Sequence, residues 1–174
     1  MTGFCLNPRP RALVSYFGYG DIVGPWYSQP DEFYRTQPLA SQKEALSVVG
    51  VTPISDPPQD NQRDKFYVYC GQNGLWTRQA TGRDPQTEDK WFNSYCPIRN
   101  VTAKYPPTIV IHGTADTDVP YTQSRDMDAM LGKAGVVHKL ITVDGAEHRL
   151  AGAKPEELSR VTARVVEFVK AHTA

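Results

Sequence analysis

The stretch Thr108–Pro120 (TIVIHGTADTDVP) most constrains how this chain can fold. It opens with an apolar, β-branched run, which predicts a buried strand at residues 108–112, and it then turns at His112-Gly113. A second strand is predicted at residues 137–143. Between the two strands, apolar residues recur at helical spacing, and a glycine suited to ending a helix follows them: Met127, Met130, Leu131, Ala134 and then Gly135. The stretch therefore predicts a strand–helix–strand unit of an α/β fold.

An acidic residue and a histidine each follow one of these strands. Asp116 lies in the loop after the first strand, and His148 lies in the loop after the second. In parallel α/β sheets the carboxyl ends of the strands meet at one edge, where reactive groups collect. Taken singly, Asp116 is explained as a turn cap and His148 as a surface histidine. Their shared position after successive strands favours a functional pair.

These residues resemble the C-terminal part of the α/β-hydrolases, especially the esterase and prolyl-oligopeptidase-like branches. Such proteins carry H-G-x-x-D-x-x-V-P, as residues 112–120 do, and a later histidine beside glycine and acidic residues, as residues 144–148 do. The resemblance extends to residues 11–27 and 95–101 and covers most of the chain. It implies the C-terminal half of an α/β-hydrolase fold: a short, mostly parallel sheet flanked by helices, with an inserted lid. It also implies that Asp116 is the acid and His148 the base of a Ser-His-Asp triad.

The nucleophile of that triad is missing from the expected pattern. None of the eight serines has a glycine two residues before it, as G-x-S-x-G requires: Ser15, Ser28, Ser41, Ser47, Ser55, Ser94, Ser124 and Ser159. The chain is expected to begin just after the nucleophile's helix and to supply acid and base only. The resemblance implies hydrolysis of a carboxylic ester or a peptide. The alternative is a catalytically inactive truncated remnant that acts as a folding or interaction module.

Composition narrows the other possibilities. Lys+Arg and Asp+Glu both number 19, so nothing in the charge favours a nucleic acid or an anionic membrane as partner. No apolar run is long enough for a transmembrane helix, and the first ten residues lack the apolar core of a signal peptide. Cys5, Cys70 and Cys96 form neither a disulfide framework nor a zinc pattern, so a reduced, cytoplasmic protein is expected. No metal or organic cofactor is implied, and the remaining histidines, His112, His138 and His172, are interpreted as structural or exposed.

The expected organisation is a single partial domain spanning residues 1–174. Its core strands are predicted at about 12–17, 108–112 and 137–143, with a lid-like insertion at about 22–100 that is rich in aromatic residues. Within the insertion, Ser41 and Glu44 have the spacing of a capping box for a helix at 42–49, and residues 64–71 predict another helix. The aromatic residues fit a lid over an acyl pocket and equally the packing of the inserted segment itself. A last amphipathic helix is predicted to begin near Pro155.

Three further expectations concern contacts. Asp116, rather than Asp118, is expected to hydrogen-bond His148, and Asp118 is expected to cap the following turn near Thr122. No serine or cysteine is expected to react with a fluorophosphonate probe. Because the strand at 12–17 is apolar and lacks the neighbour of the full fold, it is expected to be an open edge. That edge predicts a homodimer, through the strand or a swapped segment, or the binding of a complementing N-terminal half.

Overall fold

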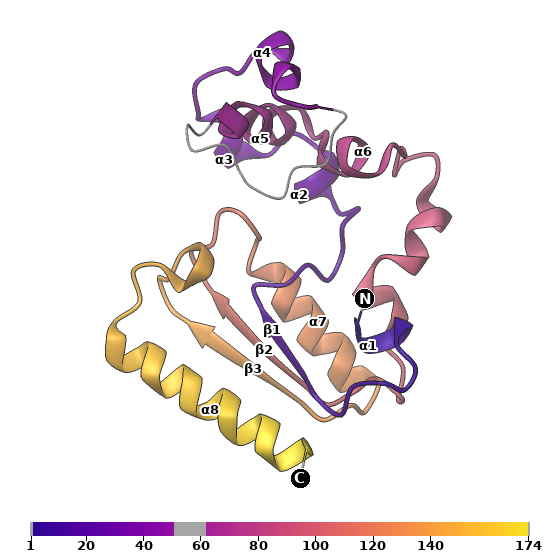
Figure 1. Cartoon of the computed structure of the whole chain (residues 1–174), viewed down its shortest axis with the longest axis vertical. Helices are drawn as coiled ribbons and strands as arrows, with labels where there is room; N and C mark the ends of the chain where they lie inside the picture. The colour runs from indigo at the N-terminus through magenta and orange to yellow at the C-terminus, as the bar shows by residue number, and fades with distance from the viewer. Residues whose placement is uncertain (1, 51–61, 174) are drawn as a thin grey trace. The chain divides into compact units, whose positions relative to one another are not determined.

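The computed structural model describes residues 2–50 and 62–173, which form two compact units (Figure 1). The first unit joins the residues up to Asp21 to those from Asn93 onward, and the second runs from Ile22 to Phe92. Residues 51–61 of the expected insertion lie outside the described residues. The first unit contains the sheet, and both residues of the predicted pair belong to it.

Three parallel strands make up the sheet, in the order β1-β2-β3. They span Leu13–Tyr16, Thr108–Gly113 and His138–Val143. Every residue of the central strand β2 is buried, as its continuous apolar run predicts for a strand covered on both faces. All three expected strands are therefore present, and the fold is the α/β arrangement of a partial α/β-hydrolase.

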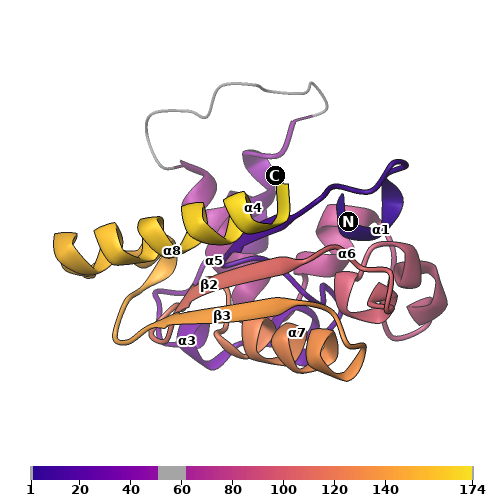
Figure 2. The same ribbon diagram turned by 90° about the horizontal axis from the view of Figure 1, so that it is seen from below.

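Two long helices cover opposite faces of this sheet, α7 (Thr122–Lys133) and α8 (Pro155–Thr173) (Figure 2). The helix α8 begins at Pro155, as predicted, and carries Glu156 and Glu157 in its first turn, where the helix dipole favours negative charge. Val161 and Phe168 of this helix pack in one core with residues of β2, of β3 and of the segment after β3: Ile109, Ile111, Ile141, Val143, Ala146 and Leu150.

The other face of the sheet packs against α7. Met127 and Leu131 of this helix join Val110 of β2, Tyr105 and Val136 in a second apolar cluster. Gly135 follows the helix with φ of 70°, the left-handed conformation expected of a residue that ends a helix. The short helix α1 (Thr2–Cys5) and the 3-10 turn η2 (Pro97–Asn100) complete this unit beside α7.

The second unit is helical over its described residues. It holds α2 (Pro25–Ser28), α3 (Glu32–Arg35), α4 (Gln42–Ser47), α5 (Gln62–Asn73) and α6 (Trp76–Thr81), and η1 (Asp89–Ser94) starts at its end.

Ser41 caps α4 as predicted: its hydroxyl accepts the Glu44 N–H and donates to the Glu44 carboxylate. The helix expected at 64–71 is longer at both ends. Aromatic rings pack inside this unit, for example Tyr67 against Trp76 at 4.4 Å between centroids. None of the described helices has the length and apolarity needed to cross a membrane.

Candidate functional site

The loops after β1, β2 and β3 meet at the carboxyl edge of the sheet, because all three strands run in parallel. The loops after β2 and β3 are bound together through their backbones. Thr114 donates its N–H to Val143 O at 3.1 Å, and Ala115 donates to Ala146 O at 3.0 Å. The Thr114 hydroxyl also donates to the Asp144 carboxylate and accepts the Gly145 N–H. The two loops thus hold Asp116 and His148 in a fixed relation.

Asp116 has a fully buried side chain whose two oxygens are both engaged. Its Oδ1 accepts the N–H groups of Asp118 at 2.9 Å and Val119 at 2.8 Å, which closes the acidic loop. Its Oδ2 lies 3.0 Å from His148 Nδ1 and 3.2 Å from His112 Nε2. Four hydrogen bonds match the acceptor capacity of a carboxylate, so the charge is satisfied without water.

The expected hydrogen bond between Asp116 and His148 is therefore present. Asp118, the rejected candidate, was expected to cap the start of α7, but the N-cap of that helix is Tyr121, and the Tyr121 side chain does not bond the helix amides. Asp116 itself closes the loop that leads to α7. The carboxylate that binds His148 thus also fixes the geometry of its own loop.

His148 begins the 3-10 turn η3 (His148–Leu150), which has unusual backbone angles. Arg149 and Leu150, which follow the histidine, have φ of 62° and 60°, a left-handed conformation that costs energy for residues with a Cβ. The ring of Phe17, at the end of β1, lies 4.7 Å from the imidazole between centroids. About a quarter of the His148 side chain remains exposed (27%). Because Nδ1 donates to Asp116, Nε2 is the basic nitrogen of the neutral ring, and no described residue hydrogen-bonds to it.

The interpretation of His112 from the sequence as structural or exposed left its hydrogen-bond partners unidentified. The ring is fully buried and both of its nitrogens are bonded. Nε2 lies 2.9 Å from Val119 O as well as 3.2 Å from Asp116, and Nδ1 lies 2.6 Å from Ser124 Oγ. A polar side chain at the end of a strand that is buried on both faces must find partners within the protein. This requirement could have indicated from the sequence that His112 is hydrogen-bonded inside the protein.

The first turn of α7 carries two buried polar residues that join this network to β1. Ser124 bonds His112, and the neighbouring Gln123 accepts through Oε1 the N–H groups of Gly20 at 3.2 Å and Asp21 at 2.8 Å. The loop after β1 is therefore fixed by the same helical turn that holds His112. The hydrogen bonds of His112 and Asp116 thus join the loops after β2 and β3 to Ser124 of α7, and Gln123 of the same helical turn holds the loop after β1.

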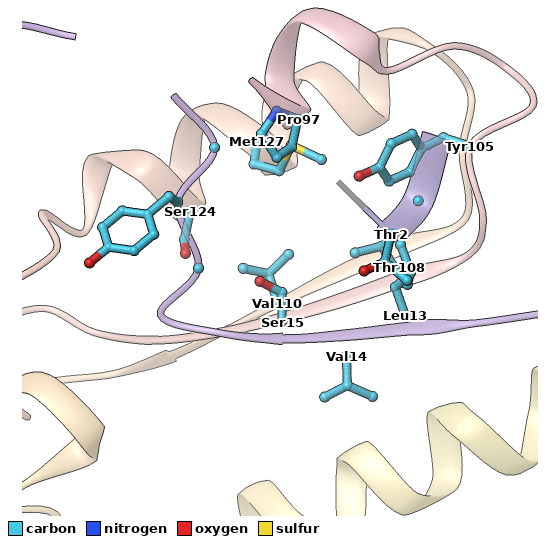
Figure 3. A pocket seen from close by; sticks show the side chains of 14 residues that line it. Thr2, Leu13, Val14, Ser15, Pro97, Tyr105, Thr108, Val110, Ser124 and Met127 are labelled. Carbon is cyan, nitrogen blue, oxygen red and sulfur yellow. The ribbon is translucent and has the colours of Figure 1, made fainter. Parts of the chain in front are cut away.

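A cavity of about 240 Å³ opens beside this assembly, between β1, α1 and α7 (Figure 3). Leu13, Ser15 and Val110 line it from the sheet, and Met127 and Ser124 line it from α7. Its lining combines apolar side chains with hydroxyl groups and contains no carboxylate or imidazole. Among residues 2–50 and 62–173, no group of three or more His, Cys, Asp or Glu side chains is arranged so that it could hold a metal ion.

Comparison with known families identifies the chain. The model of the prolyl oligopeptidase family matches residues 52–174, which include β2, β3, α7, α8 and both members of the Asp116–His148 pair. This chain belongs to the prolyl oligopeptidase family. The match confirms the predicted relationship to the α/β-hydrolases, and the family is one of serine hydrolases.

Two solved structures share the fold over most of this chain, and a third is similar to part of it. A Staphylococcus aureus Mu50 protein of unknown function aligns with a TM-score of 0.68 and 22% identity, over 94% of this chain and 57% of its own. A truncated carbohydrate esterase from gut microbiota aligns with a TM-score of 0.51 and 22% identity, over 92% of this chain and 43% of its own. A propionate-bound Thermogutta terrifontis esterase shares 27% identity over 55% of this chain and 34% of its own, with a TM-score of 0.43. The chain thus spans about half the length, or less, of these relatives. No curated protein matches it.

Proposed function

We propose that Asp116 and His148 are the acid and the base of a serine-hydrolase triad that cleaves carboxylic esters or peptides. The observation that carries this proposal is the 3.0 Å hydrogen bond from His148 Nδ1 to the buried Asp116 carboxylate, with His148 partly exposed. In such a triad the carboxylate fixes the imidazole tautomer and stabilises the imidazolium that forms during the reaction. The family and its esterase neighbours support the reaction class.

The proton path follows from this geometry. Asp116 holds the proton of His148 on Nδ1, so Nε2 takes a proton from the attacking hydroxyl and later returns it to the leaving group. None of the serines stands in G-x-S-x-G, so this chain contributes acid and base, and a complementing N-terminal half supplies the nucleophile and oxyanion donors. With water as the nucleophile, the pair alone provides general-base catalysis of about 10²–10⁴-fold.

The helical unit Ile22–Phe92 is proposed as a lid over the acyl group of the substrate. Its aromatic rings pack against one another in a cluster of Tyr27, Tyr34, Phe66, Tyr67 and Trp76. This cluster supplies the small core that a lid of this size needs. The three free thiols, among them the exposed Cys5, are consistent with work in the reducing cytoplasm.

Hydrolysis of p-nitrophenyl acetate by the purified chain tests the proposal. We expect a slow, protein-dependent rate that His148→Gln abolishes and Asp116→Asn reduces at least tenfold. Asp118→Asn is the matched control, because it removes a carboxylate from the same loop without touching His148, and it should keep the wild-type rate. An equal rate in wild type and His148→Gln would refute the assignment.

The uncovered edge of β1 supports a second candidate, a folding or interaction module. Val14 and Tyr16 of this strand are each more than a third exposed, and among the described residues β1 pairs only with β2. In this role the strand pairs with a second copy of the chain or with the complementing half. A protein that forms such a complex, but whose ester hydrolysis is unchanged in His148→Gln, would favour the module over the enzyme.

A further inference from the structure

Ser124, His112 and Asp116 form a second Ser-His-Asp array inside the protein. Ser124 Oγ lies 2.6 Å from His112 Nδ1, and His112 Nε2 lies 3.2 Å from Asp116 Oδ2. Ser124 is 1% exposed and the His112 ring is fully buried. The array shares its carboxylate oxygen with His148, so it acts directly on the acid of the proposed triad.

The hydrogen-bond partners fix where the protons of the array lie. His112 Nε2 faces two acceptors, Val119 O at 2.9 Å and Asp116 Oδ2, so this nitrogen carries the proton. His112 Nδ1 then accepts, and the Ser124 hydroxyl donates to it. The donors run in one direction, from Ser124 through His112 to Asp116. In such a chain each bond polarises the next, which strengthens His112 as a donor.

Two simpler roles compete with an effect on His148. In the first, Ser124 is itself a nucleophile. However, its hydroxyl is buried, it lies in the first turn of a regular helix, and the ring beside it is held at both nitrogens. In the second, His112 only secures the carbonyl of Val119, its shorter contact, and its approach to Asp116 has no consequence. Neither of these two roles predicts that a change at His112 or Ser124 alters the bond between Asp116 and His148, whereas a positioning role does.

We propose that His112 is a positioning residue for the base His148, acting through the shared Oδ2 of Asp116. Two imidazole N–H groups donate to this oxygen, while two backbone N–H groups hold Oδ1, so the carboxylate cannot rotate. The bond from His112 also takes part of the charge that Oδ2 presents to His148. The array thereby sets both the orientation and the strength of the Asp116–His148 bond. This inference rests on the proposed function of that pair.

The chain contains only four histidines, so nuclear magnetic resonance of ¹⁵N-histidine-labelled protein reads each ring separately. His138 at the start of β3, which donates from Nδ1 to Val136 O, and His172 near the end of α8, which donates from Nδ1 to Phe168 O, serve as internal reports on folding. The readout is the ring N–H signal of His148, which moves to lower field as its bond to Asp116 strengthens. This signal does not depend on catalysis, so it separates positioning from activity.

We expect His112→Phe to move the His148 ring N–H to lower field, because Asp116 Oδ2 is no longer shared. Ser124→Ala should cause a smaller shift in the same direction, since it weakens His112 as a donor without removing it. His112→Gln, which keeps an N–H donor of similar reach, should return the signal towards wild type. Val110→Ala, a control at a buried residue of the same strand without polar contacts, should leave the signal in place.

The outcomes separate the two proposals. An unchanged His148 signal in Ser124→Ala and in His112→Phe, with native His138 and His172 signals, would overturn the positioning role and leave His112 as the anchor of Val119. If His112→Phe does not fold, Ser124→Ala decides the matter: a shift of the His148 signal to lower field supports the positioning role, and an unchanged signal overturns it. Absence of the His148 Nδ1 proton signal in the wild-type chain would instead remove the Asp116–His148 pair, and with it the proposed function.

Discussion

At Gly113 the backbone of β2 passes so close to the loop after β3 that a side chain has no room. A Cβ at this position would lie 2.2 Å from Ala146 O and 2.7 Å from Ala146 C, and both of these are backbone atoms. The same two loops carry Asp116 and His148. Glycine is therefore required here by a close approach of two backbones that the candidate site depends on.

We predict that Gly113→Ala destabilises the protein by roughly 1–3 kcal/mol, because the loops must separate to admit the methyl group. Urea denaturation measures this change. The control is Gly132→Ala within α7, where the new Cβ would meet only the ring of His138 at 3.3 Å. Since alanine is the better helix former, the control should stay within about 1 kcal/mol of wild type. Equal stability of the two variants would contradict the argument.

Ser124 has the partners of a nucleophile but not its setting. A reactive serine stands on a strained turn with its Oγ exposed, whereas Ser124 is buried in a helical turn. We therefore predict no labelling of the isolated chain by a fluorophosphonate probe at any serine or cysteine. Mass spectrometry after long incubation checks this. Stoichiometric labelling at Ser124 would show that the buried array is itself reactive.

At the scale of elements, one apolar stripe of side chains holds α8 against the sheet. Phe168 is 8% exposed and packs in the core with Ile109, Ile111 and Val143, whereas Val166 on the same helix is 46% exposed. We predict that Phe168→Ala lowers the free energy of unfolding by about 3–5 kcal/mol, because it leaves a cavity in this core. Val166→Ala should change it by less than about 1 kcal/mol. Thermal and urea denaturation of both variants test this difference.

The elements with strong local patterns were predictable from sequence. The run Thr108–Ile111 predicted a buried strand, Pro155 predicted a helix start, and Ser41 with Glu44 predicted a cap, because each signal lies within a few residues. The exact lengths were less accurate: α5 begins at Gln62 and ends at Asn73, beyond the predicted 64–71. Helix ends depend on packing that a local pattern does not record.

The candidate site was predictable only in part. The positions of Asp116 and His148 after successive strands, together with the family resemblance, led to their pairing. His112 belongs to the H-G-x-x-D-x-x-V-P run and Gln123 to no motif, and neither residue carried a signal for its hydrogen-bond partners. Their partners, Ser124 for the first and the amides of Gly20 and Asp21 for the second, become neighbours only when the strands assemble. Tertiary contacts therefore decide the roles of these buried polar side chains.

At the scale of the whole molecule, the two edges of the sheet differ. Leu13 and Phe17 donate their N–H groups towards β2, each at 2.8 Å, so the alternate residues Val14 and Tyr16 direct theirs to the outer edge of β1. Both side chains are also exposed, at 40% and 38%. Strand β1 carries no charge or proline, whereas the opposite edge strand β3 carries the exposed Lys139, a residue type that discourages strand pairing.

We therefore predict that the chain forms a two-fold homodimer in which β1 pairs with β1 of a second copy, an isologous contact that closes on itself. Light scattering at micromolar concentration should give about twice the chain mass of 19.4 kDa. Val14→Lys should abolish the dimer or leave the protein insoluble, because it places a charge on the pairing edge. Val137→Lys is the matched control, since Val137 is an exposed valine (56%) that immediately precedes β3, and it should remain dimeric. A monomeric wild-type chain, or a Val14→Lys variant that stays dimeric, would show that the open edge of β1 does not drive association.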